Sequence, residues 1–358
     1  MAEQLKNMYT EEFVKNLAVE LNKADQKFES SKFIKSILNG DWHNRELKAR
    51  TIHISEQMNA FLPYAYKEQM NILALVAPKF VGFTAMIFPT FIELYGLDDF
   101  ETSLIYIENF TQYSSSEFAI RPYLDKKPET IKTLYNWSKS NNYHVRRLAS
   151  EGCRPLLPWA MKLHQYVKDP TPILPILEEL RNDPEDYVYR SVANNLNDIS
   201  KNHPDLVLEL CSKWINETKT TKWVAKHALR TLLKKGNQRA MLLFGFGSIK
   251  SIKPETFQLD DIQIKVGDFT QLKVGIKNTG PTSKFRLEYA IGYLKKNGAH
   301  NEKVFQLRET EVKNGESLTF SKKLDFKDLS TRKHYKGDHY VILKVNGNPV
   351  KRAEFVLE

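Results

Sequence analysis

Three carboxylate side chains stand among cations in the middle of the sequence: Glu117, Glu151 and Asp198. A carboxylate is unfavourable on a basic surface that only grips phosphates, because it repels the nucleic-acid backbone. The same carboxylate is useful if the bound target carries positive charge. The alternative interpretation is a structural ladder of ion pairs between neighbouring helices, for example between Glu151 and Arg190.

Three helices with one repeated pattern are expected to position these side chains. They are HVRRLASEGCRPLLPW from His144, YVYRSVANNLNDIS from Tyr187 and WVAKHALRTLLKK from Trp223. Polar residues recur four apart in each, so they share one helical face. Stacked side by side, the three faces form a polar groove with carboxylates at its middle. The following basic and amide side chains suit contacts with DNA phosphates: Arg146, Arg147, Arg154, Arg190, Asn194, Lys226, Arg230 and Lys234.

Each of the three helices follows a helix that starts at a proline, namely Pro128, Pro172 or Pro204. Proline suits the first helical turn because its missing N–H has no partner there anyway. Each helix pair spans roughly 40 residues, the size of a HEAT-type repeat. The sequence therefore predicts a mostly α protein built on a HEAT-like α-solenoid, with the second helix of each pair on the inner, concave surface.

Three regions are predicted along the chain. Residues 1–100 form an N-terminal helical region of the solenoid, with one helical pattern from Tyr9 to about Ile37, and residues 101–248 form the HEAT-like repeats with the active-site groove. Beyond FGFGS at Phe244–Ser248, the hydrophobic period changes to two, and the turns NTG, KNG and NGN separate about seven short strands. Residues 255–358 are therefore expected to form a small all-β immunoglobulin-like sandwich.

The charge of the chain favours an acidic partner. The net charge is +10, and from Lys250 onward 21 Lys and Arg stand against 14 Asp and Glu, so +7 lies in the C-terminal region. Nucleic acid is the commonest partner of such a chain. The basic sandwich offers either a second nucleic-acid contact or a solvated module that stabilises the end of the solenoid.

Several classes of protein are disfavoured by what the sequence lacks. The start MAEQLKNMYTEEF has no secretory signal, and prolines interrupt the apolar stretch from Ile72 to Ile92, so we expect a cytoplasmic protein without a membrane span. Cys153 and Cys211 have neither metal-ligand nor disulfide spacing and are expected to be buried. No nucleotide-binding or metalloprotease motif occurs, so no metal and no cofactor are expected.

Four motifs in order resemble a known family: SSSEFAIRPYL, NNYHVRRLASEGCRPLLPW, DYVYRSVANNLNDISKNHPDLV and TKWVAKHALRTLLKKGN. They resemble the bacterial DNA alkylation repair glycosylases of the AlkC type, in the AlkD-like superfamily of HEAT-like repeats. The resemblance covers the helical region to about Gly247, and the basic tail resembles the immunoglobulin-like domain of one subgroup. It implies a monofunctional DNA glycosylase that removes cationic N3-alkylated bases, 3-methyladenine and 3-methylcytosine, from duplex DNA without a cofactor and without base flipping.

The resemblance also implies roles for individual residues. Glu117, Glu151 and Asp198 match carboxylates that approach the deoxyribose of the lesion and stabilise its oxocarbenium-like transition state. Trp159 matches an aromatic residue that packs against the lesion nucleotide. The expected partner is double-stranded DNA containing alkylated bases, bound by a monomer in the bacterial cytoplasm that is nucleoid-associated when on DNA. The alternative is a non-catalytic DNA-binding or protein-scaffolding HEAT solenoid.

Overall fold

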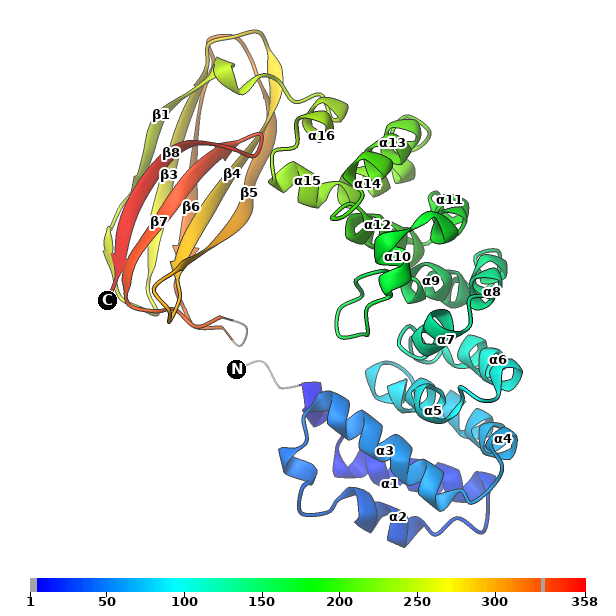
Figure 1. Cartoon of the computed structure of the whole chain (residues 1–358). Helices are drawn as coiled ribbons and strands as arrows, with labels where there is room; N and C mark the ends of the chain where they lie inside the picture. Colours follow the sequence, from blue (N-terminus) through cyan, green and yellow to red (C-terminus); the bar gives the residue numbers. More distant parts are fainter. Residues whose placement is uncertain (1–4, 330–331) are drawn as a thin grey trace. The chain divides into compact units, whose positions relative to one another are not determined.

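The computed structural model describes residues 5–329 and 332–358, and it contains a helical part followed by a β-sandwich (Figure 1). The backbone contacts divide the chain into two compact units. One comprises Met1–His203 and Trp214–Ala228, and the other comprises Pro204–Lys213 and Leu229–Glu358. Residues 1–4, which begin the stretch expected to lack a secretory signal, lie outside the described residues. The predicted succession of helices and then a β-sandwich is confirmed.

Six α-helices precede the carboxylate-bearing segments: α1 (Glu11–Ala24), α2 (Ser30–Ile37), α3 (Leu47–Phe61), α4 (Tyr66–Val76), α5 (Ile87–Tyr95) and α6 (Phe100–Phe110). The continuous helix expected from Tyr9 to about Ile37 is wrong. Asp25 leaves the helical backbone conformation at φ −139°, ψ 104°, and its carboxylate accepts from the Lys27 N–H in a turn that replaces helix bonds. Phe28 then packs edge-on against Phe33, with ring centroids 5.0 Å apart.

The region of the candidate residues contains the helices α7 (Arg121–Lys126), α8 (Thr130–Trp137), α9 (Tyr143–Gly152), α10 (His164–Lys168), α11 (Leu174–Leu180), α12 (Asp186–Ile199) and α14 (Lys219–Ala228). Helix α12 packs against both α9 and α14. The predicted apolar stripe of these helices is buried, as Leu148, Val192 and Val224 illustrate. A polar contact also joins α9 to α12, because the Ser150 hydroxyl donates to Ser191 Oγ at 2.7 Å.

Two predicted helices end earlier than expected. α9 stops at Gly152, and Pro155 and Pro158 keep the following RPLLPW segment out of a helix. α14 stops at Ala228, Leu229 interrupts the helix at φ −88°, ψ 6°, and α15 (Arg230–Lys234) begins after it. The expectation that Lys226, Arg230 and Lys234 share one face of a continuous helix is therefore wrong. Arg230 and Lys234 belong to the second compact unit.

The second unit contains α15, α16 (Gln238–Leu243) and most of α13 (Pro204–Trp214), followed by the strands β1 (Ile252–Leu259), β2 (Gln263–Ile264), β3 (Phe269–Asn278), β4 (Ser283–Leu294), β5 (His300–Val312), β6 (Ser317–Asp325), β7 (Gly337–Val345) and β8 (Asn348–Leu357). One sheet has the order β1-β3-β6 and the other β2-β8-β7-β4-β5. Only the short β2–β8 pair is parallel among these pairings. Side chains such as Leu272, Phe285 and Val341 form the buried core of the sandwich.

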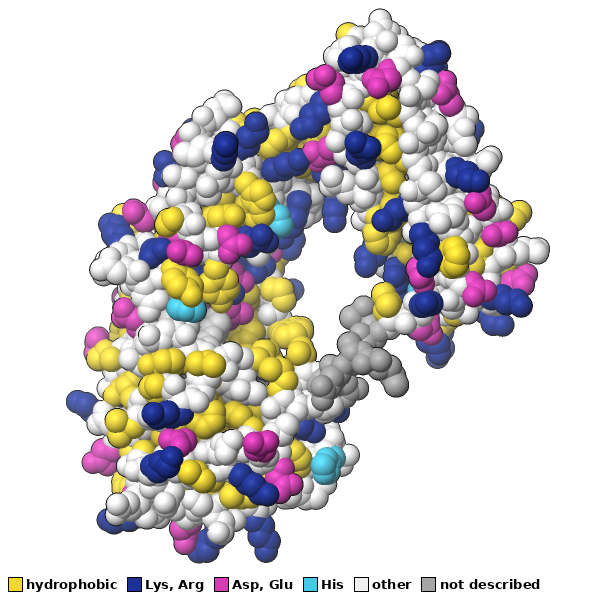
Figure 2. Space-filling view, turned by 180° about the vertical axis from the view of Figure 1, so that it is seen from behind, with side chains coloured by type: hydrophobic (Ala, Val, Ile, Leu, Met, Phe, Trp, Pro, Cys, Tyr) yellow, Lys and Arg dark blue, Asp and Glu magenta, His cyan; other side chains and the backbone are white. Residues whose placement is uncertain are grey.

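Strand β1 was not expected from the sequence. Its register shifts between Pro254 and Thr256, and this irregularity hides the alternation that marks the other strands. On the face drawn in Figure 2, Lys and Arg side chains are interspersed with Asp and Glu over the sandwich rather than gathered into one patch. The positive charge of this unit is thus spread over its surface.

The apolar stretch from Ile72 to Ile92 is divided between the end of α4, two short 3-10 helices (Ala77–Lys79 and Phe83–Met86) and α5. Within residues 5–329 and 332–358, no helix combines the length and the apolar character needed to cross a membrane. Further 3-10 turns lie at Leu5–Met8, Trp42–Asn44, Thr171–Ile173 and Ile249–Ser251.

Gly96 at the end of α5 offers a test of packing in the helical unit. The Ser103 hydroxyl donates to the Gly96 carbonyl at 2.7 Å, and a Cβ at Gly96 would lie 2.3 Å from Tyr66 Oη and 2.4 Å from Ser103 Oγ. Gly96→Ala is therefore expected to lower the free energy of unfolding by about 1–3 kcal/mol in urea denaturation. Gly40→Ala is the control, since a Cβ there meets nothing within 4 Å. Equal stability of the two variants would contradict this packing.

Candidate functional site

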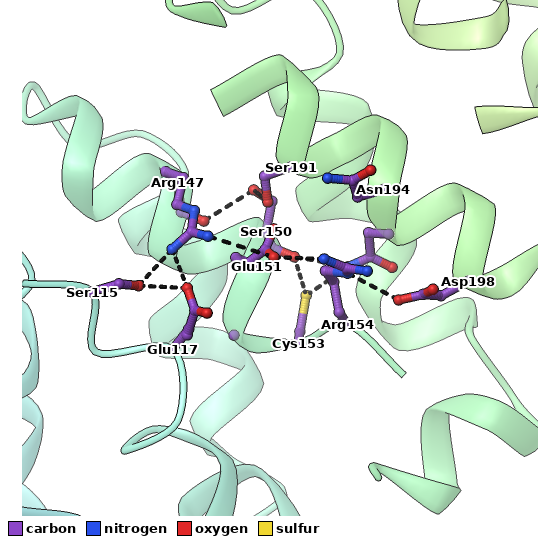
Figure 3. A network of polar contacts seen from close by, with 12 residues as sticks. Ser115, Glu117, Arg147, Ser150, Glu151, Cys153, Arg154, Ser191, Asn194 and Asp198 are labelled. Carbon is purple, nitrogen blue, oxygen red and sulfur yellow. Dashed lines mark hydrogen bonds and ion pairs between the residues drawn. The ribbon is translucent and has the colours of Figure 1, made fainter. Parts of the chain in front are cut away.

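The three carboxylates and two arginines form one alternating chain of ion pairs in the helical unit (Figure 3). Arg147 Nη1 donates to Glu117 Oε2, and Arg147 Nη2 lies 3.5 Å from Glu151 Oε1. Arg154 Nη1 donates to the same Glu151 oxygen at 2.6 Å, and Arg154 Nε donates to Asp198 Oδ2 at 2.9 Å. Residues from three separate segments thus meet as the sequence predicted.

Local structure explains how each segment contributes. Arg147 and Glu151 lie four residues apart on α9, and Arg154 follows just beyond the end of that helix. Asp198 lies on α12. Glu117 lies in the turn that precedes α7. There it accepts a hydrogen bond of 2.6 Å from the Ser115 hydroxyl.

The chain of ion pairs is buried and balanced in charge. The Glu151 and Asp198 side chains are 6% and 3% exposed. Three carboxylates face three cations, because Lys201 Nζ lies 3.0 Å from Asp198 Oδ1. Burial alone lowers the pKa of Arg147 and Arg154, but the neighbouring carboxylates, Glu151 first, outweigh burial and raise both pKa values. The guanidinium groups stay charged and hold the carboxylates in fixed positions.

The ion-pair ladder considered from the sequence has different members from those expected. Glu151 pairs with Arg147 and Arg154, not with Arg190. Arg190 Nε instead lies 3.0 Å from Asp186 Oδ2 on its own helix, where both side chains are more than half exposed.

A cavity of about 630 Å³ opens beside the network. Glu117, Glu151, Arg154 and Trp159 line it. Asp198 does not line this cavity. The guanidinium of Arg154 links Asp198 to Glu151, which does line it. The cavity therefore offers a ligand two fixed carboxylates and the exposed ring of Trp159.

Trp159 is held in an unusual position by its loop. Its backbone has φ 65°, a left-handed conformation that a non-glycine residue adopts only when the surroundings fix it, and the residue is 72% exposed. Arg121 fixes this loop by donating to the carbonyl oxygens of Met161 at 2.6 and 2.9 Å, Gly152 at 2.8 Å and Arg154 at 2.9 Å. Burial lowers the pKa of Arg121 to about 10, so its guanidinium remains charged near neutral pH.

Two further aromatic residues at the cavity were not among the predicted site residues. His144 and Tyr187 also line it, and the guanidinium carbon of Arg147 lies 4.7 Å from the centroid of the Tyr187 ring. A signal for them was present in the sequence, because His144, Tyr187 and Trp223 each precede the first valine of the three aligned helices. Burial lowers the pKa of His144, which favours its neutral form.

The remaining predicted DNA contacts are dispersed. Arg146 turns away to Asp183, with Nε donating to Oδ2 at 2.6 Å. Asn194 Oδ1 lies 3.3 Å from His227 Nε2. The guanidinium carbon of Arg190 lies 5.3 Å from the centroid of the Trp223 ring. Lys226 lies on α14, whereas Arg230 and Lys234 lie on α15. Only Arg147 and Arg154 of this set join the carboxylates.

Among the described residues, the cysteines and the other side chains that could bind a metal do not gather at one site. Cys153 and Cys211 are buried free thiols, as predicted, and burial raises the pKa of each to about 12. Outside residues 1–4 and 330–331, His, Cys, Asp and Glu side chains form no group suited to hold a metal ion.

Comparisons with known families define the class of this protein. Residues 96–232, which contain the carboxylate network, match the family described as "DNA alkylation repair enzyme". Residues 253–358 match the family described as "Uncharacterised protein YhaZ, C-terminal Ig-like domain". Fold and site together are those of a DNA alkylation repair protein with a C-terminal immunoglobulin-like domain.

Two relatives match over almost the whole chain. The uncharacterized protein YhaZ of Bacillus subtilis (strain 168) is 40% identical over 352 residues, which is 98% of each protein. The structure of the Pseudomonas fluorescens alkylpurine DNA glycosylase AlkC, bound to DNA containing an abasic site analog, matches with 36% identity and a TM-score of 0.95 over 99% of this chain and 100% of that one. The chain therefore belongs to the AlkC type of DNA alkylation repair enzymes, which confirms the resemblance found in the sequence.

Arg121 provides a test of how the Trp159 loop is held. Arg121→Met removes the donor from three carbonyl groups, two of them buried, and is expected to lower stability by about 3 kcal/mol. Arg121→Lys should lose nearly as much, because an ammonium group cannot reproduce the planar fork. Thermal unfolding measures both. The control is Arg45→Met, which loses only an exposed hydrogen bond to Asn39. A stability loss at Arg121 no larger than at Arg45 would contradict this role.

Proposed function

We propose that this protein is a monofunctional DNA glycosylase that removes cationic N3-alkylated bases, 3-methyladenine and 3-methylcytosine, from duplex DNA. The observation that carries the proposal is the position of Glu151. This buried carboxylate lines the cavity beside exposed Trp159, and two arginines fix it there. Full-length similarity to an alkylpurine DNA glycosylase supports the same conclusion.

The proposed reaction is hydrolysis of the bond between C1′ of the deoxyribose and the base nitrogen. An N3-alkylated base carries positive charge, so it leaves with the bonding electron pair as a neutral molecule. Positive charge builds on the sugar as the bond stretches, and the fixed carboxylates of Glu117 and Glu151 stabilise it. A water oxygen then bonds to C1′, and the proton that it loses passes to a carboxylate and on to solvent.

The paired state of the carboxylates suits this chemistry. Arg147 and Arg154 hold the Glu151 carboxylate in place, so the site needs no reorganisation when charge develops on the sugar. Trp159 can offer its ring face to the same cation, an interaction of about 1–2 kcal/mol when desolvated. Asp198 contributes through Arg154, which it anchors, or as a third carboxylate near the sugar, as the family resemblance implies.

The finer description of the molecule belongs to this proposal. The packing of α12 against both α9 and α14 supports a HEAT-like α-solenoid, with an N-terminal helical region at 1–100, repeats at 101–248 and an immunoglobulin-like sandwich at 255–358. An exposed aromatic side chain at an open cavity supports excision without base flipping. We further propose a monomer that acts on DNA in the cytoplasm, at the nucleoid.

Loss of the carboxylate charge should abolish base release. Glu151→Gln and Asp198→Asn are each expected to lower the single-turnover rate on 3-methyladenine-containing duplex by about 100-fold or more, while DNA affinity stays within about twofold. Glu12→Gln is the control, since this side chain is exposed on α1. Rates near those of the wild type for both variants would overturn the assignment. A small effect of Asp198→Asn alone would restrict Asp198 to anchoring Arg154.

The alternative function is a non-catalytic DNA-binding or protein-scaffolding solenoid. Release of methylated base from alkylated DNA in a metal-free buffer distinguishes the two. An intact protein that binds the DNA but releases no base would favour the alternative.

The basic sandwich is proposed to contact phosphates through Lys253 and Lys277. These exposed residues lie directly opposite each other on β1 and β3, an unfavourable placement of like charges that a bound anion would relieve. Lys253→Gln/Lys277→Gln should weaken DNA binding and reduce the slope of log affinity against log salt by about 1.8. The matched control is Lys15→Gln/Lys23→Gln, whose ammonium groups pair within α1. An unchanged slope would leave the sandwich as a structural module.

A further inference from the structure

A second cavity, of about 420 Å³, lies within the helical unit and shares a wall with the first. Trp159, Phe83, Met86 and Phe118 line both cavities. The second cavity also contains a carboxyl group from a helix to which the proposed reaction assigns no role, that of Glu93 on α5.

Two packed helices build the polar side of this cavity. Thr90 and Glu93 lie three residues apart on α5, and Lys48 and Ile52 lie four apart on α3, so each pair shares one helical face. α3 packs against α5, and the Ser55 hydroxyl fixes the contact by donating to the Ile87 carbonyl at 2.9 Å. The position of Glu93 is therefore set by rigid elements rather than by a loop.

Glu93 is an unusual carboxyl group in this unit. Its side chain is half-buried among apolar neighbours, and no hydrogen bond or ion pair connects it to any residue of 5–329 or 332–358. Burial raises its pKa, and the charge of Lys48 opposes this only in part. Other carboxylates at the two cavities are satisfied: Glu117 and Glu151 by arginines and Glu46 by Lys6 at 2.7 Å. An unpaired carboxyl in an apolar cavity is a typical sign of a ligand site.

The side chains that line the second cavity indicate the chemical class of its ligand. Three aromatic side chains, Phe83, Phe118 and Trp159, favour a flat heteroaromatic ring. The one unpaired carboxyl of this lining, that of Glu93, favours a ligand that carries an amino donor next to a ring nitrogen. An ionised Glu93 accepts from the amino group, and a protonated Glu93 donates to the nitrogen, so the group serves in either state. An adenine ring meets all of these requirements.

We propose that the second cavity is a binding site for the excised N3-alkylated purine, which Glu93 holds through its amino edge after the base is released from the duplex beside Trp159. The inference rests on the proposed function, because that function supplies the base. It adds a product site to a reaction that otherwise releases its base directly to solvent.

Binding of the free base tests this site without DNA. 3-Methyladenine is titrated into the full chain by calorimetry, and saturable binding at one site per chain is expected. Glu93→Leu should weaken the affinity by about tenfold, and Glu93→Gln, which keeps an acceptor, should weaken it less. Ile52→Phe should weaken it by about tenfold as well, because the larger side chain fills the cavity. Thermal unfolding of each variant shows that it is folded.

The control is Glu46→Leu, which removes a carboxyl from the same lining, but one that is 79% exposed and paired with Lys6. It should leave the affinity within about twofold of the wild type. Absence of saturable binding, or equal affinities of Glu93→Leu and the wild type, would overturn the proposal. So would binding that Glu151→Gln weakens and Glu93→Leu does not, because the base would then occupy the first cavity.

The outcome separates this inference from the proposed function. A chain that releases base from alkylated DNA but does not bind 3-methyladenine refutes the product site alone. A chain that binds 3-methyladenine through Glu93 but releases no base refutes the glycosylase and keeps the site.

Discussion

Burial of an ionised carboxylate is unfavourable unless a cation and hydrogen bonds replace the lost water, and this constraint organises the helical unit. Glu151 is the centre of the arrangement, because it is buried and forms ion pairs with two arginines at once. Each arginine reaches one further carboxylate, Glu117 or Asp198, on another segment. The turn before α7, the helix α9 and the helix α12 are thereby tied together at one point.

The same constraint gives the site its chemical character. A carboxylate held by arginines keeps its position, so it presents its oxygens to the cavity at a fixed place. Trp159 stands beside it in a left-handed backbone conformation, which persists because Arg121 binds the carbonyl groups on both sides of the loop. The buried arginines are therefore as important to the site as the acidic residues. Of Arg121, Arg147 and Arg154, only Arg154 lines the cavity.

Local patterns in the sequence were sufficient for most of the fold. The periods of 3.6 and 2 separated helices from strands. The errors fall where a short-range interaction overrides the period. Asp25 ends α1 with a side-chain turn, Leu229 interrupts the third repeated helix, and a register shift near Pro254 conceals β1. Each of these depends on the backbone conformation of one or two residues.

The sequence by itself determined which residue types could form the site, since the spacing of Arg147 and Glu151 fixes a common helical face. It also determined the family, because four motifs occur in order. Only the tertiary structure decided the pairings: Glu151 with Arg154 instead of Arg190, Arg146 with Asp183, and Glu93 beside Trp159. The reason is physical. Helical periodicity fixes neighbours within one or two turns, whereas contacts between segments depend on how the helices pack, and that packing is set by the whole core.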